Sequence, residues 1–354
     1  MFTSVLLLKI LIIVAVFAVS LGIAAYATYG ERKIAGFMQD RYGPDRAGPF
    51  GLLQPLADGG KMIFKEEFIP AAANKWLFIM GPSLAMLVCN MTGVVIPWAR
   101  PMMMEDGTLF QFQVTDINIG ILYFFGVVSL GVYGIMIGGW ASNNKYSMMG
   151  VLRASSQMIS YELAMGIALV ALIMTTGTLS LNEIVEQQDK GWCNFVYQPL
   201  GFLIFIICAF AECNRAPFDL PESESELVGG YHTEYSSMKL GFYLFAEYIN
   251  MFVSSAVMAT LYFGGYHFPF ENEMIGTLGI GGVRILGFML LMGKVVFFIF
   301  LFMWIRWTLP RFRYDQLMDL GWKTLLPLSI LNLVVTGIII AINEGWFKAV
   351  PSPY

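Results

Sequence analysis

Charged residues are scarce in this sequence. Lysine and arginine together number 21 and aspartate and glutamate 25, so only 13% of the 354 residues carry a charge. That is about half of the roughly 25% that is typical of soluble domains. The net charge of −4 leaves no excess of basic residues for binding nucleic acid. The composition therefore argues against a soluble two-domain enzyme, a disordered chain and a nucleic-acid-binding protein.

Patterns that bind metals or nucleotides are missing as well. The four cysteines form no C-x-x-C pair, and three of them lie in or beside apolar stretches, where buried hydrophobic cysteines are common. The two histidines, His232 and His267, are too far apart to form a metal site with each other. Neither G-x-G-x-x-G nor G-x-x-x-x-G-K-S/T occurs. We therefore expect no NAD, flavin, metal or iron–sulfur cluster to be bound by this chain itself.

Apolar residues, by contrast, make up 57% of the sequence. A membrane-spanning helix needs about 20 residues, so the chain has apolar material for eight spans. Five windows carry no charge and three carry one charge each, at Glu162, Glu247 and Lys294. We predict an all-α integral membrane protein, a single membrane domain with eight transmembrane helices at residues 5–29, 76–99, 117–140, 154–177, 197–214, 240–263, 285–307 and 324–343.

The connections between the predicted helices alternate in basic charge. Residues 31–75, 140–153, 212–239 and 306–323 hold most of the lysines and arginines, so the positive-inside rule places them on the cytoplasmic side and both termini on the outer side. From residue 49 to 67, apolar residues recur every three or four positions. This predicts an amphipathic helix lying in the cytoplasmic interface. The alternative is an ordinary surface helix packed on a partner.

Among the charged residues inside or at the ends of predicted spans, four are informative: Glu162, Glu212, Glu247 and Lys294. A charge at the bilayer centre costs roughly 2.5–3.5 kcal/mol, so each needs an internal partner or a path to water. Their depths allow them to converge into one polar row running from the cytoplasmic loops towards the middle of the membrane. Buried acids in such a row can exchange protons near neutral pH, which favours a proton path. The alternative is a Lys–Glu pair that only fixes helix packing.

The connection at residues 212–239 is unusually acidic. Its acids are Glu212, Asp219, Glu222, Glu224, Glu226 and Glu234, against Arg215 and Lys239. On an extended segment the alternate positions of Glu222, Glu224 and Glu226 would aim three carboxylates to one side. Such a density of acids opposes the positive-inside trend. We therefore interpret the loop as functional, the alternative being a merely solvated loop.

The same loop also carries a resemblance. Residues 211–235, AECNRAPFDLPESESELVGGYHTEY, closely resemble the signature of one membrane-subunit family of respiratory complex I. This family includes the H subunit of bacterial NADH:quinone oxidoreductase and its counterpart, mitochondrial NADH dehydrogenase subunit 1. Further matching motifs follow in the expected order: Glu31-Arg-Lys33, QDRYGP at 39–44, GLLQPLAD at 51–58, Lys65-Glu66, ISYE at 159–162 and PRFRYDQLM at 310–318.

The resemblance implies a subunit that is inactive alone and forms the membrane end of a quinone chamber. Ubiquinone or menaquinone would enter beneath the interfacial helix and be reduced near an iron–sulfur cluster of a neighbouring subunit. To this chamber the resemblance assigns Arg32, Gln39, Arg41, Asp58, Lys61, Phe218 and Asp219. It assigns Glu162, Glu212, Glu222, Glu224, Glu226 and Glu247 to an acidic row that relays quinone reduction to proton translocation. The residue pattern adds Lys294 to this proton path.

The resemblance also implies partners and a location. The expected partners are the iron–sulfur and quinone-site subunits of a peripheral arm, small membrane subunits, antiporter-like subunits and lipid, in the inner membrane of a bacterium. One departure from the family pattern is that Ser129–Gly134, on the third predicted helix, contains no acid. The acidic row is then shorter on that helix, or is completed by water or by another residue.

Three other functions stay open at this point. The first is the corresponding subunit of a membrane-bound hydrogenase or of another donor-specific relative of complex I. The second is a stand-alone proton-coupled transporter, although the inverted repeats typical of transporters are not visible in the sequence. The third is a structural anchor that contributes nothing to coupling, against which the membrane-embedded charges argue.

Overall fold

The computed structural model describes residues 2–103, 109–189, 193–222, 224–269 and 271–343. Its helices are α1 (Phe2–Met38), α2 (Gln54–Phe64), α3 (Lys75–Thr92), α4 (Gly120–Ala141), α5 (Lys145–Thr176), α6 (Leu181–Asp189), α7 (Asn194–Tyr197), α8 (Pro199–Glu212), α9 (Glu224–Leu227), α10 (Ser237–Tyr262), α11 (Glu271–Thr308), α12 (Tyr314–Asp319) and α13 (Leu326–Asn343). Short 3-10 turns cover Pro49–Gly51, Gly93–Val95 and Gly230–His232, and a π-helical segment, Leu320–Leu325, joins α12 to α13. Two short strands, β1 (Met102–Met103) and β2 (Leu109–Phe110), pair antiparallel.

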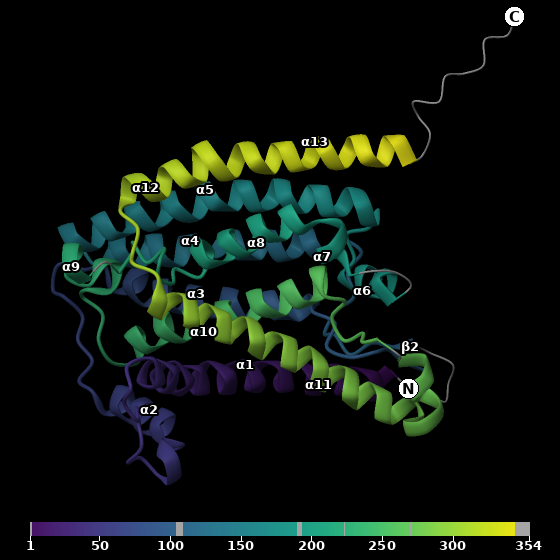
Figure 1. Cartoon of the computed structure of the whole chain (residues 1–354). Helices are drawn as coiled ribbons and strands as arrows, with labels where there is room; N and C mark the ends of the chain where they lie inside the picture. Colours follow the sequence, from purple (N-terminus) through teal and green to yellow (C-terminus); the bar gives the residue numbers. More distant parts are fainter. Residues whose placement is uncertain (1, 104–108, 190–192, 223, 270, 344–354) are drawn as a thin grey trace, which may run out of the picture.

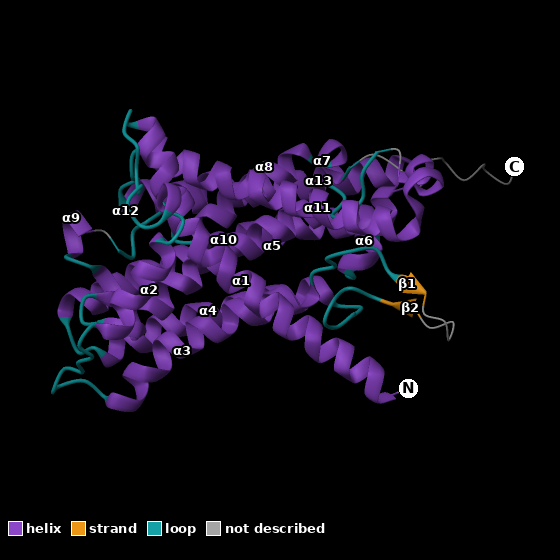
Figure 2. Cartoon of the chain, turned by 90° about the horizontal axis from the view of Figure 1, so that it is seen from below, coloured by secondary structure: helices purple, strands orange, loops and turns teal. Residues whose placement is uncertain are grey.

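The long helices lie side by side as one bundle (Figures 1 and 2). In the described ranges, seven helices are long and apolar enough to cross a membrane, counting α12 to α13 as one. Their outer faces expose large apolar side chains such as Leu7, Leu122 and Ile342, as expected where the surrounding solvent is lipid. The predicted all-α integral membrane protein is confirmed.

The one predicted span that is not among these seven, residues 197–214, corresponds to α8. This helix is apolar but has 14 residues, which reach about 21 Å, less than the roughly 30 Å of a hydrocarbon core. The short helix α7 precedes it directly. The count of eight transmembrane helices therefore stays a prediction.

The two ends of the bundle differ in the elements that they carry. One end carries α2, α9 and α12, and we call it the α2 end. The opposite end carries α6, the β1–β2 hairpin, the start of α1 and the end of α13 (Figure 1). The two ends of the described chain therefore lie on the same side, as expected for an even number of spans.

Two helices extend beyond their predicted bounds at the α2 end. Helix α1 continues to Met38 and so includes Glu31, Arg32 and Lys33, which the charge pattern places in a loop. Helix α5 begins at Lys145 rather than near residue 154. The charged turn at Glu31–Lys33 can stay helical here because Glu31 is buried beside the cation of Arg306 and the hydroxyl of Tyr248.

Helices α3, α4 and α10 pack closely through glycines. A Cβ atom at Gly138 of α4 would overlap the hydroxyl of Tyr243 on α10. A Cβ atom at Gly81 of α3 would lie 2.7 Å from the Cα atom of Gly138. Small residues at such crossings let helix backbones approach within the membrane. This packing holds α10, which carries Glu247, rigidly in the centre of the bundle.

Helix α2 projects from the bundle (Figure 1), and none of its residues is buried. Its neighbourhood is nevertheless anchored: Ser237 Oγ donates to the Met62 carbonyl at 2.9 Å, and Tyr29 Oη donates to the Phe50 carbonyl at 2.7 Å. Its apolar side chains Leu56 and Phe64 are exposed. These features fit the predicted amphipathic helix.

Candidate functional site

A buried arginine organises the polar groups at the α2 end. Arg215 follows α8, and its Nη1 lies 3.6 Å from a carboxylate oxygen of Glu31 and its Nη2 lies 3.7 Å from one of Glu247. Its guanidinium stacks 3.9 Å from the ring centroid of Tyr248. Side chains from α1 and α10 therefore meet at one cation that follows α8.

Further donors complete this group. Tyr248 Oη donates to Glu31 at 2.7 Å, and Arg306 of α11 forms an ion pair with the same carboxylate. Tyr231 Oη donates to Glu247 at 3.0 Å. We call these six residues the Arg215 cluster: Glu31, Arg215, Tyr231, Glu247, Tyr248 and Arg306. Buried charges are costly unless they are paired and hydrogen-bonded, so each member depends on the others.

The loop between α8 and α9 adds a second acidic group beside the Arg215 cluster. Asp219 is buried and accepts from Arg311 Nη2 at 2.7 Å. Burial, and next the charge of Glu222, raise the pKa of Asp219 to about 7, against the opposing charge of Arg311. A carboxylate of Glu222 also lies 3.7 Å from His232 Nδ1. The loop therefore holds one acid, Asp219, that can change charge near neutral pH.

Two further acids lie deeper in the bundle. Glu212 at the end of α8 is 5% exposed, and its Oε2 has no hydrogen-bond partner among the described residues. The charge of Glu162 on α5 acts on it. Glu162 in turn accepts a hydrogen bond from Ser129 of α4. Glu162 and Glu212, which we call the deep pair, therefore link α4, α5 and α8 through polar groups inside an otherwise apolar region.

The thiol of Cys213 lies within electrostatic reach of both Glu212 and the Arg215 cluster. This thiol is buried, and the charges of Glu212 and Glu247 both act on it. A cavity of about 30 Å³ adjoins Glu247 and is lined by Asn214, Tyr231 and Asn250 with residues of α3, α4 and α5. A polar cavity needs about 10–15 Å³ to hold a water molecule, so this one has room for water.

A second cavity lies beneath α2. It has a volume of about 100 Å³ and is bounded by α1, α2 and α10. Arg32 Nη1 donates to Asp58 at 2.7 Å on its wall, and Lys61 Nζ lies 3.9 Å from the same carboxylate. Tyr248 also lines this cavity. The hydroxyl of Tyr248 thus connects the cavity directly to Glu31 of the Arg215 cluster.

The structure brings together only part of the residues that the sequence assigned to the quinone chamber. Arg32 and Asp58 line the cavity beneath α2, and Lys61 pairs with Asp58. Gln39 and Arg41 bond to each other on the exposed surface after α1. Phe218 is buried in the bundle, where its ring packs against Tyr161 and Phe312.

The residues assigned to the proton path are also divided. Glu162 and Glu212 form the deep pair, while Glu222 and Glu247 lie in or beside the Arg215 cluster. Glu226 forms an ion pair with Arg153 at the surface. The side chain of Glu224 lies outside the described residues.

Lys294 does not join the acidic row. Its Nζ donates to the carbonyls of Phe263, Gly265 and His267 at 2.8, 2.7 and 2.9 Å. These carbonyls belong to the loop between α10 and α11, at the end of the bundle opposite α2. An ammonium has three donors, so the loop satisfies all of them.

Sequence reasoning missed the basic members of the site, Arg215, Arg306 and Arg311, and the acid Glu31. Arg215 and Arg311 stand within the resembling motifs. Because acids outnumber bases around Arg215, the loop was interpreted through its carboxylates and not through this arginine. Glu31 is visible in the sequence as the first charge after a charge-free window. A buried charge of one sign requires partners of the other, and that argument could have located these residues.

In the described ranges, no group of three or more histidine, cysteine, aspartate or glutamate side chains could hold a metal ion. The side chains that the site does contain can bind polar or apolar groups and move protons.

Comparison with known proteins identifies the family. A sequence model of NADH dehydrogenase matches residues 9–337. An H subunit of the NADH-quinone oxidoreductase of Cytophaga hutchinsonii is 65% identical over 94% of this chain and 96% of its own length. The H subunit of the same enzyme from Flavobacterium psychrophilum is 61% identical over 93% of this chain and 96% of its own length. Subunit 8 of the enzyme from Rhodothermus marinus is 48% identical over 90% and 93% of the two chains. With such matches along nearly its whole length, this chain belongs to the NADH dehydrogenase family.

Proposed function

We propose that this chain is a membrane subunit of a bacterial, proton-translocating NADH:quinone oxidoreductase. In this proposal it forms the membrane end of the quinone chamber and links quinone reduction to proton movement through buried carboxylates. The observation that carries the proposal is the position of Tyr248, which lines the cavity beneath α2 and donates to Glu31 of the Arg215 cluster. The names of the relatives favour a quinone enzyme over a hydrogenase or a stand-alone transporter.

The cavity beneath α2 suits a molecule with an apolar tail and a polar head. Ala25, Met62, Leu244 and Phe245 provide apolar walls, and the Arg32–Asp58 pair provides polar groups at the rim. Ligand sites of this kind are mostly apolar with a few polar groups that fix orientation. The cavity opens beneath an exposed amphipathic helix, so a quinone could enter it from the bilayer.

The Arg215 cluster can respond to charge that develops in the chamber. Reduction of a quinone to a quinol consumes two electrons and two protons, so acids that supply those protons become negatively charged. The charge of Glu222 acts on both Asp219 and Glu247, and Arg215 acts on both as well. Because these charges act on one another, a change of charge at one group is felt by the others. A local change of charge of this kind is a common way to switch a protein between two conformational states.

The deeper acids extend the path towards the membrane interior. From Glu247 the water-sized cavity leads along Tyr231 and Asn250 towards α4 and α5, which carry Ser129 and Glu162. Glu212 interacts with Glu162, and Glu212 and Glu247 both act on the thiol of Cys213. We place Glu222, Glu247, Glu212 and Glu162 in the path. We leave Lys294 and Glu226 out of it because their partners lie elsewhere.

The proposal includes an orientation and partners. The α2 end would face the cytoplasm and bind the peripheral arm with its iron–sulfur and quinone-site subunits. The end with α6 and both termini would face the periplasm of the bacterial inner membrane. Small membrane subunits and antiporter-like subunits would cover part of the exposed apolar helix faces.

Purification of the intact assembly tests the proposal as a whole. A tagged chain extracted in mild detergent should bring down a large complex with iron–sulfur absorbance and NADH:quinone reductase activity. An iron–sulfur arm without quinone reduction would contradict the assignment in favour of a hydrogenase-type relative. A chain purified alone as a small oligomer would contradict it in favour of a transporter.

A matched pair of glycines tests the quinone chamber. Gly59 and Gly60 are neighbours in α2, and a Cβ atom at either would meet no atom within 4 Å, but only Gly59 lines the cavity. We expect Gly59→Phe to fill the cavity and to lower quinone reduction by about tenfold or more, as a blocked binding pocket would. Gly60→Phe should leave it nearly unchanged.

The measurement for this pair is NADH:quinone reduction by the purified complex, with NADH:ferricyanide reduction as the control for an intact peripheral arm. Equal quinone turnover in both variants, at equal ferricyanide activity, would contradict a chamber beneath α2.

The pH dependence of quinone reduction tests the loop. With a pKa of about 7, Asp219 is mostly neutral at about pH 6 and mostly charged at about pH 8. The raised pKa means that folding favours the protonated form of Asp219. The stability that Asp219 contributes in this form is fully present below about pH 4 and is lost as the pH rises through about 7. We expect Asp219→Asn, which stays neutral, to react at about pH 8 as the parent does at about pH 6. Initial rates across this range check the prediction, and an unchanged inflection near pH 7 would contradict it.

A further inference from the structure

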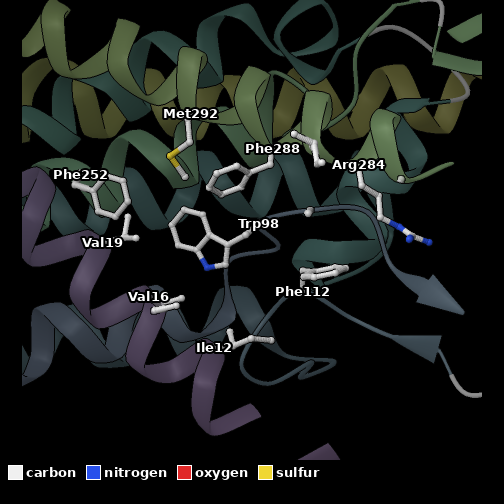
Figure 3. Close-up of a pocket in the computed structure, with 13 residues that line it drawn as sticks. Ile12, Val16, Val19, Trp98, Phe112, Phe252, Arg284, Phe288 and Met292 are labelled. Carbon is white, nitrogen blue, oxygen red and sulfur yellow. The ribbon is translucent and has the colours of Figure 1, made fainter. Parts of the chain in front are cut away.

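A large apolar cavity lies near the end of the bundle opposite α2. It has a volume of about 430 Å³ and is bounded by α1, α10, α11 and the segment that contains Trp98 and Phe112 (Figure 3). Val19 and Phe252 mark its deep end, and Phe112 and Arg284 mark its outer end. Arg284 and Met292 stand eight residues apart on α11, so the cavity extends about 12 Å along the helix axis. Its size is within the roughly 300–1,000 Å³ of small-molecule sites.

Two hydrogen-bond donors in this cavity lack partners. The indole Nε1 of Trp98 is buried and has no acceptor among the described residues. Trp98 as a whole is only 8% exposed, so water reaches it little. The Nε of Arg284 is buried and unpaired in the same way, and its Nη2 makes one hydrogen bond, of 3.3 Å, to the Pro101 carbonyl. A buried donor without a partner is destabilising, and more so when the group is charged. Both donors therefore call for acceptors that the described part of this chain does not supply.

We propose that this cavity binds one glycerophospholipid, with an acyl chain in the apolar part, an ester carbonyl near Trp98 Nε1 and the phosphate at Arg284. The apolar walls, formed by residues such as Val16, Val19, Phe252, Phe288 and Met292, suit the acyl chain. A guanidinium is the side chain best suited to a phosphate, because both are charged and their geometries match. The position of Arg284 at the outer end gives the lipid the orientation of the outer leaflet.

A transmembrane helix of a neighbouring subunit fits the cavity less well. Such a helix satisfies its own backbone carbonyls internally, so it would leave Trp98 Nε1 and Arg284 Nε without acceptors. A phospholipid carries four or more acceptor oxygens directly above its acyl chains. The two unpaired donors therefore favour lipid over protein as the occupant.

Photolabelling of the assembled complex tests this site. The purified complex is placed in phosphatidylcholine nanodiscs that contain phosphatidylglycerol with a diazirine on one acyl chain, and labelled peptides are identified by mass spectrometry. We expect labelling of the segments around Val16, Trp98 and Phe288. A diazirine-bearing diacylglycerol, which has no phosphate, should label them much less.

Ala15 and Val14 provide a matched pair for blocking the cavity. Both lie on the same turn of α1, but only Ala15 lines the cavity, while Val14 is 61% exposed on the outer face. Ala15→Trp should abolish labelling at Trp98 and Phe288, and Val14→Trp should retain it. Val19→Trp is a second blocking variant in case Ala15→Trp does not assemble. Equal labelling of the blocking variants and Val14→Trp would overturn the proposal.

Arg284→Gln tests the phosphate contact separately. Loss of a charge-assisted hydrogen bond of about 1.5–3 kcal/mol should lower phosphatidylglycerol labelling by roughly tenfold or more, to the level of diacylglycerol. Equal labelling by the two probes in the parent complex would overturn the assignment of a phospholipid.

Discussion

Replacing Arg215 with leucine is expected to remove most of the assembled complex from the membrane. The substitution leaves Glu247 buried without its cation, and Glu31 with Arg306 as its remaining ion-pair partner. Removing one partner of a buried ion pair costs about 3–5 kcal/mol because an uncompensated charge remains. A loss of this size is a large part of the stability of a typical domain. The measurement is the content of complex in membranes, determined by immunoblotting and by NADH:ferricyanide reduction.

Compensating substitutions distinguish this electrostatic explanation from simple misfolding. The double variant Arg215→Leu/Glu247→Gln removes one of the stranded charges and should restore part of the complex, without restoring quinone-linked proton movement. Arg313→Leu is the matched control, because Arg313 pairs with Asp315 at the exposed surface, where ion pairs contribute little. Normal complex content in Arg215→Leu, or equal losses in Arg215→Leu and Arg313→Leu, would contradict a central role for Arg215.

The parts of the site that could be predicted from sequence are those whose signal is local. Glu162 and Glu247 stand alone in apolar windows, and a lone charge in such a window indicates a buried functional group. The bundle itself follows from the lengths and spacing of the same windows. A helix in the region 49–67 follows from its own periodicity, and the structure places one at Gln54–Phe64.

The remaining parts depend on contacts between distant segments. Lys294 is as isolated in its apolar window as Glu162. Its ammonium nevertheless donates to three backbone carbonyls of a loop about 30 residues earlier in the chain. Backbone acceptors of this kind cannot be predicted from the pattern of side chains. Phe218 stands beside Asp219 in the motif, but its ring packs in the core against Tyr161 and Phe312. Arg215 is surrounded by acids in sequence, whereas the acids that it contacts come from α1 and α10.

Replacing Glu212 with glutamine is expected to separate quinone reduction from proton translocation. Glutamine keeps the shape of the side chain but cannot carry a proton, and Glu212 stands between the Arg215 cluster and Glu162 in the proposed path. Its Oε2 has no hydrogen-bond partner among the described residues, so the neutral amide should not disturb a network of bonds. The complex should therefore assemble normally.

Glu186→Gln is the matched control for this variant. Glu186 is an exposed acid on α6, at the end of the bundle opposite α2, and lies outside the proposed path. Its replacement makes the same chemical change, from carboxylate to amide, and should alter neither assembly nor coupling.

The ratio of protons translocated to electrons transferred, measured in proteoliposomes with the purified complex, tests the role of the buried acids most directly. We predict that Glu212→Gln lowers this ratio to less than about half of the parent value, as loss of a required proton carrier in a coupled path implies. Glu186→Gln should keep the parent ratio. An unchanged ratio in Glu212→Gln, at normal complex content, would contradict the claim that these carboxylates link quinone reduction to proton movement.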